Sequence, residues 1–477
     1  MAVTLVILVP LALAAAALAW PDARSRPWLL LAGAGAHAAG MVALWLRPEP
    51  PLAEGYLFLD AAGKVVLSTT SALFLATAVY AQGYLRRRPE KDNRVFVSGL
   101  LGLLAAMTVV GLAQHLGILW VAIELTTLAT APLIYFNRNA RSLEAAWKYL
   151  LVSSLGIALA LLGTFFIALS GAGPGGPRSL LVGALVEAGP GLSKPWVRAA
   201  FVVLLVGYGT KMGLAPLHSW TPDAYGEAPG ILGALLAGGV TNVAFLSLAR
   251  VFQVTRAAGE AAFACDALIG LGLLSMALAA VFMAGQRDFK RMLAYSSVEH
   301  MGILAIGLGL GGGAVAGAFY HVLNNGLAKG VLFLTAGNIH RAYGSKRVDE
   351  VRGASRRLPL SGPLFFAGFL AVTGTPPFSP FWSEFVILNG ALGKGRYAVG
   401  GLFILFLAVV FVGMGATVLK VVQGDDRGAP ERPGFADSWL TAGPPLALLA
   451  SVLALGLWLP APLAALFRSA AALMGGS

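Results

Sequence analysis

Residues 207–220 read GYGTKMGLAPLHSW, and residues 373–385 read TGTPPFSPFWSEF. Each stretch lies in a long apolar segment and joins glycine, proline and an aromatic residue to one ionisable residue, Lys211 or Glu384. Glycine and proline interrupt helices, and non-helical backbone at membrane depth is tolerated only where protein or water surrounds it. Both stretches therefore predict broken membrane helices that carry buried ionisable groups.

The composition of the chain is that of an all-α polytopic membrane protein. Of 477 residues, 57% are hydrophobic and 12% are charged, and the mean hydropathy is +0.77. Soluble domains carry about 25% charged residues. The single cysteine, Cys265, excludes a disulfide framework and an iron–sulfur cluster held by four thiolates of this chain. The opening stretch lacks a basic segment, so we expect a retained first helix and not a cleaved signal peptide.

We expect about fourteen membrane spans, because one span needs about 20 apolar residues. The segment 359–390 is too long for one uninterrupted helix, and the Gly/Pro-rich segments 171–198 and 420–437 are expected to be linkers. The expected spans are 2–20, 27–46, 65–84, 95–113, 116–136, 149–170, 199–216, 229–249, 267–285, 292–309, 314–340, 359–390, 398–419 and 438–466.

Basic residues collect on one side of this predicted topology. Most of the 34 Lys and Arg lie in one set of alternate loops: 21–26, 85–94, 137–148, 217–228, 286–291, 341–358 and 420–437. The positive-inside rule places these loops in the cytoplasm and both termini on the non-cytoplasmic side. The net charge of +12 then reflects topology and not nucleic-acid binding. The runs 86–88 and 356–357 are read as topological signals, with a docking surface for a cytoplasmic partner as the alternative.

Ionisable residues inside the predicted spans are functional candidates, because a charge at the centre of a span costs at least about 2.5–3.5 kcal/mol. Glu124 lies in LGILWVAIELTTLA (116–129), and Lys211 lies beside the first break. A Glu–Lys pair whose separation changes can take up and release a proton, because the carboxylate stabilises the ammonium ion. The alternative is a static ion pair that fixes helix packing.

A second group of polar residues shares one helix face. His321, Asn325 and Lys329 are spaced i, i+4, i+8, with about 6 Å along the axis between neighbours. Proton transfer needs hydrogen-bond contacts of about 3 Å, so water must bridge these residues. We interpret them as half of a proton wire; the alternative is a set of polar residues that ties helices together.

Further candidates lie near span ends. Glu384 follows the proline-rich break and is expected to end the wire on the side away from the cytoplasm. Glu299 and His300, in KRMLAYSSVEHMG, are either an entry group or a hydrated structural pair. His218 is a secondary candidate near the end of a span.

Motifs for other chemistry are missing from the sequence. It contains no P-loop, no GxGxxG between strand and helix, and no HExxH, so we expect no catalytic, cofactor or metal site in this chain. Trp120, Trp220 and Trp382 are expected to be interface anchors or packing residues. The two broken segments lie five spans apart, an odd number that gives them opposite membrane orientation, as in the inverted repeats of secondary transporters.

Three motifs carry a family resemblance: GYGTKMGLAPLHSWTPDAYGEAP (207–229), FKRMLAYSSVEHMG (289–302) and HVLNNGLAKGVLFLTAGNIH (321–340). They resemble the antiporter-like membrane subunits shared by respiratory complex I, Mrp cation/proton antiporters and group 4 membrane-bound hydrogenases. The stretch WVAIELTTLATAPLIYFNRNARSLEAAWKYLL (120–151) resembles hydrogenase-4 component F of formate hydrogenlyase-type complexes.

The resemblance implies fourteen helices with two inverted five-helix repeats. Spans four to eight would occupy 95–250 and spans nine to thirteen 262–420, flanked by three helices in 1–94 and one in 437–470. It also implies a hydrated central proton path. The residues that match the family's proton-transfer positions are Glu124, Lys211, His300, His321, Lys329 and Glu384.

Two positions depart from the family pattern. Asn242 in GGVTNVAFLSLAR stands where the family usually has a lysine that links the half-channels, and Asn325 stands where many relatives have a second histidine. Either water bridges these positions or transport is slower or absent. We keep Asn242, Asn325, His218 and Glu299 as secondary proton-path candidates.

The sequence thus predicts a proton-translocating subunit of a redox-driven complex in a bacterial or archaeal cell (inner) membrane, a group 4 [NiFe] hydrogenase or a complex I-like assembly. Expected partners are other membrane subunits, membrane lipid and a cytoplasmic redox arm that carries Fe–S clusters and a Ni–Fe site. One alternative is an Mrp-type cation/proton antiporter subunit that uses Na⁺. The other is a non-conducting membrane anchor of the hydrogenase, which Asn242 favours.

Overall fold

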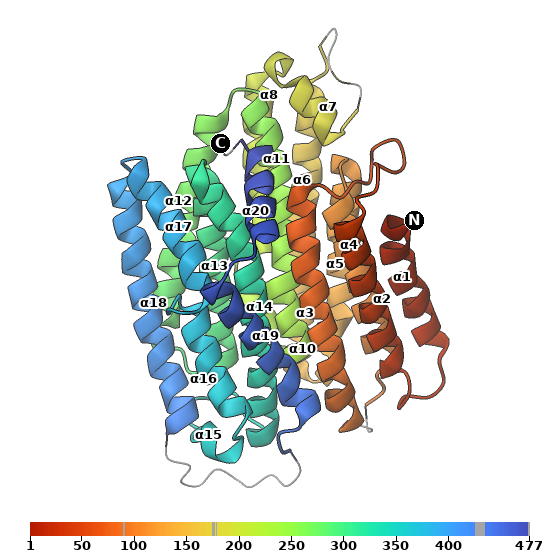
Figure 1. The fold of residues 1–477 in the computed structure, drawn as a ribbon, viewed down its shortest axis with the longest axis vertical. Helices are drawn as coiled ribbons and strands as arrows, with labels where there is room; N and C mark the ends of the chain where they lie inside the picture. Colours follow the sequence, from red (N-terminus) through yellow and green to blue (C-terminus); the bar gives the residue numbers. More distant parts are fainter. Residues whose placement is uncertain (89–90, 174–176, 178, 425–434, 476–477) are drawn as a thin grey trace.

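The computed structural model describes residues 1–88, 91–173, 177, 179–424 and 435–475. Regular structure in these residues is helical, apart from isolated β-bridges in the loops. Long apolar segments fold as helices because lipid offers their backbone groups no hydrogen-bond partners. The helices run side by side in one bundle (Figure 1), which confirms the predicted all-α membrane class.

The N-terminal part of the bundle lies along one side of Figure 1. Its helices are α1 (Ala2–Ala19), α2 (Pro27–Leu46), α3 (Ala61–Arg86), α4 (Arg94–Leu112), α5 (Leu116–Ile134) and α6 (Ala140–Ser170), with a 3₁₀ turn at Tyr135–Asn137.

The middle of the chain contains the first predicted break. Its helices are α7 (Val182–Glu187), α8 (Lys194–Met212), α9 (Trp220–Glu227), α10 (Gly230–Leu235), α11 (Thr241–Ala257), α12 (Ala261–Met283) and α13 (Phe289–Leu310), with a 3₁₀ turn at Gly189–Gly191 and a π-helical segment at Leu236–Val240.

The C-terminal part contains the second predicted break. Its helices are α14 (Gly313–Tyr343), α15 (Ala354–Arg357), α16 (Ser361–Val372), α17 (Ser379–Gly393), α18 (Tyr397–Gln423), α19 (Trp439–Leu457) and α20 (Ala461–Leu473).

Eleven helices in the described residues are long and apolar enough to cross a membrane. Three of the fourteen predicted spans fall outside this set: α8, α14 and the pair α16–α17. The helices α8 and α14 are 19 and 31 residues long, but α8 carries a buried lysine and α14 carries buried lysine, asparagine and histidine side chains. The pair α16–α17 is interrupted, so neither of its helices is long enough alone.

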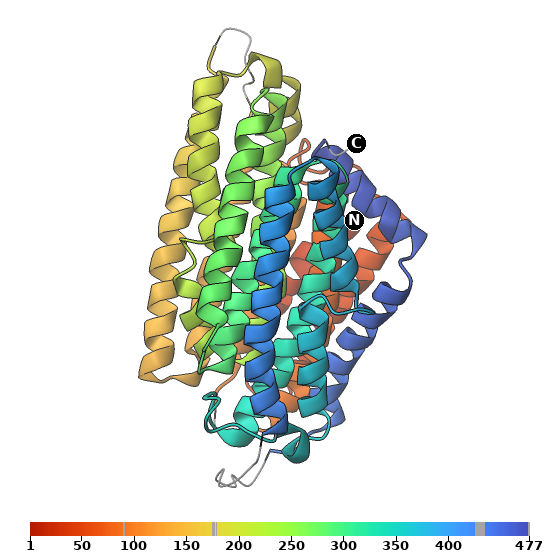
Figure 2. The same cartoon turned by 90° about the vertical axis from the view of Figure 1, so that its left-hand side faces the viewer.

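The helix α14 forms the centre of the bundle. It packs against α3, α10, α13, α16, α17, α19 and α20. In the most apolar stretch of Gly230–Ala257 all of the residues are buried, and in that of Phe289–Leu310 94% are, so polar residues on these helices are shielded from lipid. Figure 2 shows α5 and α6 at one edge of the bundle and α19 and α20 at the opposite edge.

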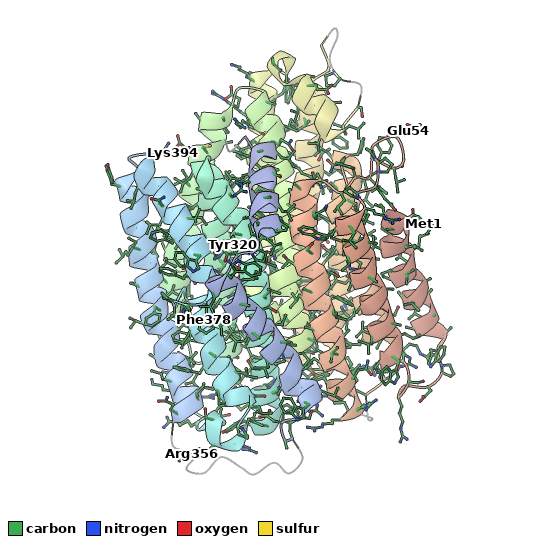
Figure 3. All side chains as sticks on the ribbon, viewed as in Figure 1. Met1, Glu54, Tyr320, Arg356, Phe378 and Lys394 are labelled. Carbon is green, nitrogen blue, oxygen red and sulfur yellow. The ribbon has the colours of Figure 1, made fainter. Side chains whose placement is uncertain are left out.

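Both predicted breaks are present. The helix α8 ends at Met212, Gly213 adopts a φ of +82°, and α9 begins only at Trp220. The helix α16 ends at Val372, Gly374 adopts a φ of +64°, and α17 begins at Ser379. Positive φ values favour glycine, which explains its place in each break. In Figure 3, Phe378 lies part-way between Lys394 at one end of the bundle and Arg356 at the other.

Several predicted boundaries are wrong. The helix α6 begins at Ala140 and not at 149, because a capping box of Asn139 and Ser142 starts it in a polar stretch that hydropathy ignores. The predicted loop 217–228 contains α9, and the predicted linker 171–198 contains α7. The last predicted span is two helices, α19 and α20, separated by residues 458–460, which end in a proline.

Some of the predicted loops fall partly outside the described residues: 89–90 of the loop 85–94, 174–176 and 178 of the linker 171–198, and 425–434 of the linker 420–437. The two termini lie toward the same end of the bundle (Figure 1), whereas Arg356 lies at the opposite end (Figure 3).

Candidate functional site

Lys211 occupies a closed polar pocket at the end of α8. Its side chain is fully buried, and Nζ donates hydrogen bonds to Thr127 Oγ1 on α5 at 2.8 Å and to Tyr149 Oη on α6 at 2.6 Å. The helix end at Gly213 brings the last turn of α8 beside these two helices. Three helices therefore hold one ammonium group through hydroxyl oxygens.

Glu124 lies on the same face of α5 as Thr127, one turn away. It is half-buried, its Oε1 accepts a hydrogen bond from Ser154 Oγ at 2.8 Å, and its buried Oε2 has no partner among the described residues. No ion pair within 4.0 Å joins it to Lys211, but it is near enough to act on the lysine electrostatically. The carboxylate of Glu124 and the ammonium group of Lys211 are therefore near each other without forming an ion pair.

Lys329 has a similar environment on α14. It is fully buried, and Nζ donates to Ser296 Oγ on α13 at 2.6 Å. Glu299, one turn further along α13, is also buried and interacts electrostatically with Lys329. Each buried lysine is thus bound by a hydroxyl group and influenced by a carboxylate from a neighbouring helix.

His300 and His321 form a hydrogen-bonded pair between α13 and α14. His300 Nδ1 and His321 Nε2 are 2.9 Å apart, and both rings are buried. His321 Nδ1 lies 2.9 Å from Ser383 Oγ on α17, while the Ser383 hydroxyl donates to the Pro380 carbonyl at 2.9 Å. The assignment that satisfies all of these groups has His321 Nδ1 as a donor to Ser383, and His321 Nε2 as an acceptor from His300 Nδ1.

Glu384 extends this group to the second break. It lies on α17 and is buried, and its Oε1 has no hydrogen-bond partner among the described residues. A Cβ atom at Gly374 would collide with Glu384 Oε2, so the carboxylate lies directly against the interrupted backbone. One ligand atom each from Glu384, His300 and His321 lie within 4.8 Å of one another.

Asn242 and Asn325 lie between helices at the centre of the bundle. Asn242 Nδ2 donates to the carbonyls of Gly238 at 2.8 Å and Val322 at 3.1 Å, while its Oδ1 lacks a partner among the described residues. Neither side-chain polar atom of Asn325 has such a partner, although the residue is fully buried. Buried polar atoms are satisfied by protein or by ordered water, so both amides predict water here.

The π-helical segment Leu236–Val240 ends two residues before Asn242. A Cβ atom at Gly238 would lie 2.7 Å from the Gly326 carbonyl oxygen on α14, so the two backbones approach closely through glycines. Segments of π-helix within α-helices are frequent at functional sites.

His218 is not part of these groups. It is half-buried in the turn between α8 and α9, beside the rings of Phe282 and Tyr295, at centroid distances of 6.4 and 6.2 Å. No hydrogen bond between described residues joins its ring to another candidate. Of the three tryptophans, Trp220 is a packing residue: it is fully buried and donates to the Thr210 carbonyl at 2.8 Å.

Sequence reasoning missed the hydroxyl partners Thr127, Tyr149, Ser296 and Ser383. The sequence does little to distinguish these residues, because single serine, threonine and tyrosine residues are common in apolar helices. It also missed His37, a buried histidine on α2 with Nδ1 3.1 Å from Ser71 Oγ and Nε2 2.9 Å from Thr108 Oγ1. Both ring nitrogens have partners there, so His37 ties α2 to α3 and α4.

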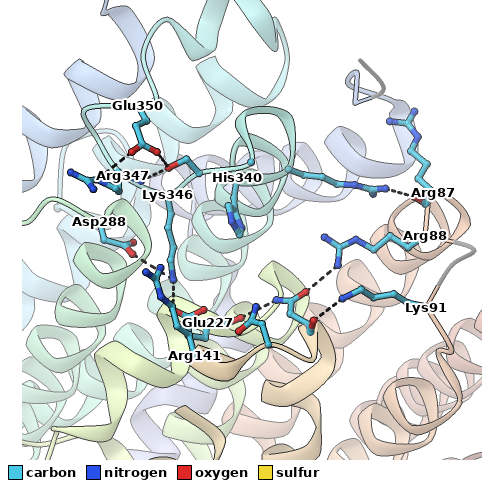
Figure 4. Close-up of a pocket in the computed structure, with 15 residues that line it drawn as sticks. Arg87, Arg88, Lys91, Arg141, Glu227, Asp288, His340, Lys346, Arg347 and Glu350 are labelled. Carbon is cyan, nitrogen blue, oxygen red and sulfur yellow. Dashed lines mark hydrogen bonds and ion pairs between the residues drawn. The ribbon is translucent and has the colours of Figure 1, made fainter. Parts of the chain in front are cut away.

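A basic cavity of about 790 Å³ opens at the end of the bundle where α3 and α14 terminate (Figure 4). Lys346 is paired there with Glu227 at 2.6 Å and Asp288 at 3.6 Å. Arg88 instead donates to the neutral Asn137 Oδ1 at 3.1 Å. Seven Lys or Arg line the cavity against three acids, the cations being Arg87, Arg88, Lys91, Arg141, Arg341, Lys346 and Arg347.

A family model for the transmembrane region of NADH:quinone oxidoreductases and Mrp antiporters matches residues 113–412. The chain belongs to this family. It is an antiporter-like membrane protein, as the motifs around Lys211, His300 and Lys329 predicted. The matched region contains both broken helices and every candidate of the site.

Individual relatives agree with the family match. A hydrogenase-4 component F homolog of Methylacidiphilum infernorum is 33% identical over 419 residues, which cover 85% of this chain and 86% of the relative. A chain of respiratory complex I from Thermus thermophilus has a TM-score of 0.78 at 28% identity, over 96% of this chain and 97% of that chain. A chain of the Mrp complex from Dietzia has a TM-score of 0.87 at 21% identity, over 99% and 97% of the two chains, a likeness of fold.

Proposed function

We propose that this chain translocates protons as a membrane subunit of a redox-driven complex, either a group 4 membrane-bound [NiFe] hydrogenase or a related complex I-like assembly. The observation that carries the proposal is the pair of fully buried lysines, Lys211 and Lys329. Each donates to a hydroxyl group and lies within electrostatic reach of a carboxylate to which it is not ion-paired.

Such an environment suits a group that changes its protonation state. A hydroxyl group accepts a hydrogen bond from an ammonium ion and donates one to a neutral amine, so it is a partner in both states. The nearby carboxylate favours the charged state by an amount that depends on its distance. A change at Glu124 or Glu299 therefore alters whether its lysine holds a proton.

The proposed route joins these groups in sequence. Charge movement near Glu124 releases the proton of Lys211, which moves through water at Asn242 and Asn325 to Lys329. From there it passes the His300–His321 pair and leaves beside Glu384. The hydrogen bond between the two histidines is direct, at 2.9 Å, whereas the step across the two asparagines requires water.

We further propose the arrangement of the chain in the membrane. It has fourteen spans, counting α8, α14 and α16–α17, with inverted repeats at 95–250 and 262–420. The end that carries Arg356 and the basic cavity faces the cytoplasm of a bacterium or archaeon, and both termini lie on the other side. The basic cavity is then available to a cytoplasmic redox arm.

The energy must come from partner subunits. Moving one proton against 100 mV costs about 2.3 kcal/mol. The sequence has no cofactor motif, and we assign the Fe–S clusters and the Ni–Fe site to the partners. The M. infernorum relative, named for hydrogenase-4, favours the hydrogenase branch over an Mrp-type exchanger driven by Na⁺.

The decisive variants are Lys329→Ala and Lys329→Arg in the intact complex, reconstituted in vesicles. Arginine keeps the positive charge but does not release its proton in proteins. We expect both variants to abolish redox-linked proton uptake measured with a pH-sensitive dye, while electron transfer in uncoupled vesicles continues. Lys420→Ala, at an exposed lysine of α18, is the matched control and should translocate normally.

The outcome separates the proton carrier from its alternatives. Normal proton uptake by Lys329→Arg would mean that the lysine only balances charge, and the proposed function would be wrong. Uptake that requires Na⁺ and continues without electron transfer would identify an Mrp-type exchanger.

A further inference from the structure

Three side chains that are far apart in the sequence meet where α13, α14 and α17 pack together. His300, His321 and Glu384 are 1%, 0% and 5% exposed, and one ligand atom from each lies within 4.8 Å of the others. These residues have no metal-ligand spacing along the chain, because each comes from a different helix. Only the fold assembles the set.

We propose that His300, His321 and Glu384 form a binding site for a divalent transition metal ion, for which Zn²⁺ and Co²⁺ are the probes. Two imidazole nitrogens and one carboxylate oxygen are the donor set of many three-residue zinc sites, which leave a further position open. Imidazole donors favour Zn²⁺, Co²⁺, Ni²⁺ and Cu²⁺ over Mg²⁺ and Ca²⁺.

The geometry of the histidine pair fits this role. His300 Nδ1 and His321 Nε2 are 2.9 Å apart, close to the separation of about 3.3 Å between two ligands of a tetrahedral metal with bonds of about 2.05 Å. Metal binding needs the His300 proton to move from Nδ1 to Nε2, or to leave. The Nε2 atom is buried and has no hydrogen-bond partner among the described residues, so it has no competing contact to break.

The groups around the three ligands also suit metal binding. His321 Nδ1 donates to Ser383 Oγ at 2.9 Å, which orients the ring and keeps Nε2 unprotonated, so Nε2 can bind a metal once the His300 proton has moved from Nδ1. A hydrogen bond from the other ring nitrogen is the usual support of a metal-bound histidine. Glu384 Oε1 has no hydrogen-bond partner among the described residues, so the carboxylate can turn toward a metal without losing a protein contact.

The surrounding charges allow a dication. Glu299 on α13 lies near enough to interact electrostatically with Glu384 and with Lys329. The negative charges of these two carboxylates therefore offset part of the positive charge of a bound dication and of the Lys329 ammonium group.

Occupancy would have a consequence that rests on the proposed function. The metal would take the nitrogen lone pairs that pass a proton between the two histidines. Zn²⁺ at this site should therefore stop redox-linked proton uptake while leaving uncoupled electron transfer unchanged.

Binding is tested on the purified intact complex by titration with Co²⁺, whose visible absorption reports nitrogen and oxygen ligands. We expect one saturable Co²⁺ per copy of this chain above the background of the other subunits, displaced by Zn²⁺ and not by Mg²⁺. His321→Ala and Glu384→Gln should each remove it. His37→Gln, which changes an equally buried histidine with both nitrogens hydrogen-bonded, should keep it.

Ser383→Ala keeps all three ligands and removes only the hydrogen-bond partner of His321. It therefore tests the site even if the ligand variants fail to fold. Loss of such a partner typically weakens metal binding by about 10–100-fold, and we expect a shift of that size. Equal Co²⁺ occupancy in the wild type and His321→Ala, or equal loss in His37→Gln, would overturn the site. Zn²⁺ that fills the site without slowing proton uptake would overturn its proposed consequence.

The two proposals fail in different ways. Co²⁺ binding that only the ligand variants remove would support the metal site even if Lys329→Arg still pumped protons. Normal pumping in the wild type without specific Co²⁺ binding would remove the metal site and leave the proton-translocation proposal intact.

Discussion

Lys211 and Lys329 are buried cations that the structure holds through hydroxyl groups and not through ion pairs, which is why we propose that their charge state can change. Their nearest partners are hydroxyl oxygens at 2.6–2.8 Å, and no carboxylate of the described residues lies within ion-pair distance of either lysine. A tight buried ion pair would resist proton release, because removing one charge leaves the other uncompensated at a cost of about 3–5 kcal/mol. Looser electrostatic contact makes the proton exchangeable.

Tyr149→Phe tests this interpretation of Lys211. The change removes one of the two hydroxyl partners, and hydrogen bonds to charged groups contribute about 1.5–3 kcal/mol. We expect redox-linked proton uptake in vesicles to fall strongly, with little change in uncoupled electron transfer. Tyr208→Phe is the matched control, because Tyr208 is equally buried and its hydroxyl has no partner among the described residues.

A fall in Tyr208→Phe as large as that in Tyr149→Phe would mean that loss of any buried hydroxyl disturbs the bundle. Unchanged uptake in Tyr149→Phe would remove Lys211 from the proposed route.

An ionisable group in an apolar helix is rare and conspicuous, so the sequence alone singles out Glu124, Lys211, His321 and Lys329 as candidates. Their partners could not be predicted, since a threonine or serine in an apolar helix often bonds only its own backbone. Thr126 does so, donating to the Ile123 carbonyl at 2.6 Å, while its neighbour Thr127 binds Lys211.

Among the helices, the broken pair α16–α17 matters most for the site. Gly374 has a φ of +64° and lies against the Glu384 carboxylate, so the break positions the last proposed proton group. An alanine there would be strained by its backbone and would displace Glu384.

Gly374→Ala should therefore lower thermal stability and proton uptake together. The backbone strain alone is worth about 1 kcal/mol or more, and displacement of Glu384 adds a loss of Co²⁺ binding. Thermal unfolding of the detergent-solubilised complex and the Co²⁺ titration measure the two effects. Gly393→Ala, where a Cβ would meet nothing within 4 Å, should match the wild type in both.

If Gly374→Ala unfolded at the wild-type temperature and bound Co²⁺ as the wild type does, the position of the Glu384 carboxylate would not depend on the break. The role assigned here to α16–α17 would then be wrong.

Both breaks could be predicted from glycine and proline, whose backbone effects are local. The π-helical segment Leu236–Val240 could not, because it goes with a close approach of Gly238 to Gly326 on another helix. The helix α9 and the start of α6 were also missed, since polar helix ends carry no hydropathy signal.

At the scale of the whole molecule, the proposed proton-path residues lie on α5, α8, α11, α13, α14 and α17, and of these helices α13 and α17 pack directly against the central α14. Hydropathy predicted the bundle, yet the central helix α14 lies outside the set of described helices that are apolar enough to count as spans. The helix α14 is central and fully surrounded, so it can carry polar residues that a lipid-facing helix would exclude. The polar residues that we propose carry protons are therefore also the ones that lower the hydropathy of this helix.

The proposed proton route requires a continuous hydrated connection between the Lys211 and Lys329 pockets, across Asn242 and Asn325. The most direct measurement is an electron cryo-microscopy map of the complex in lipid at a resolution that shows ordered water. We predict water molecules bound to Asn242 Oδ1 and to both side-chain polar atoms of Asn325, in a chain that reaches each lysine. Dry aliphatic packing around these two amides, with no water between the lysine pockets, would contradict the account.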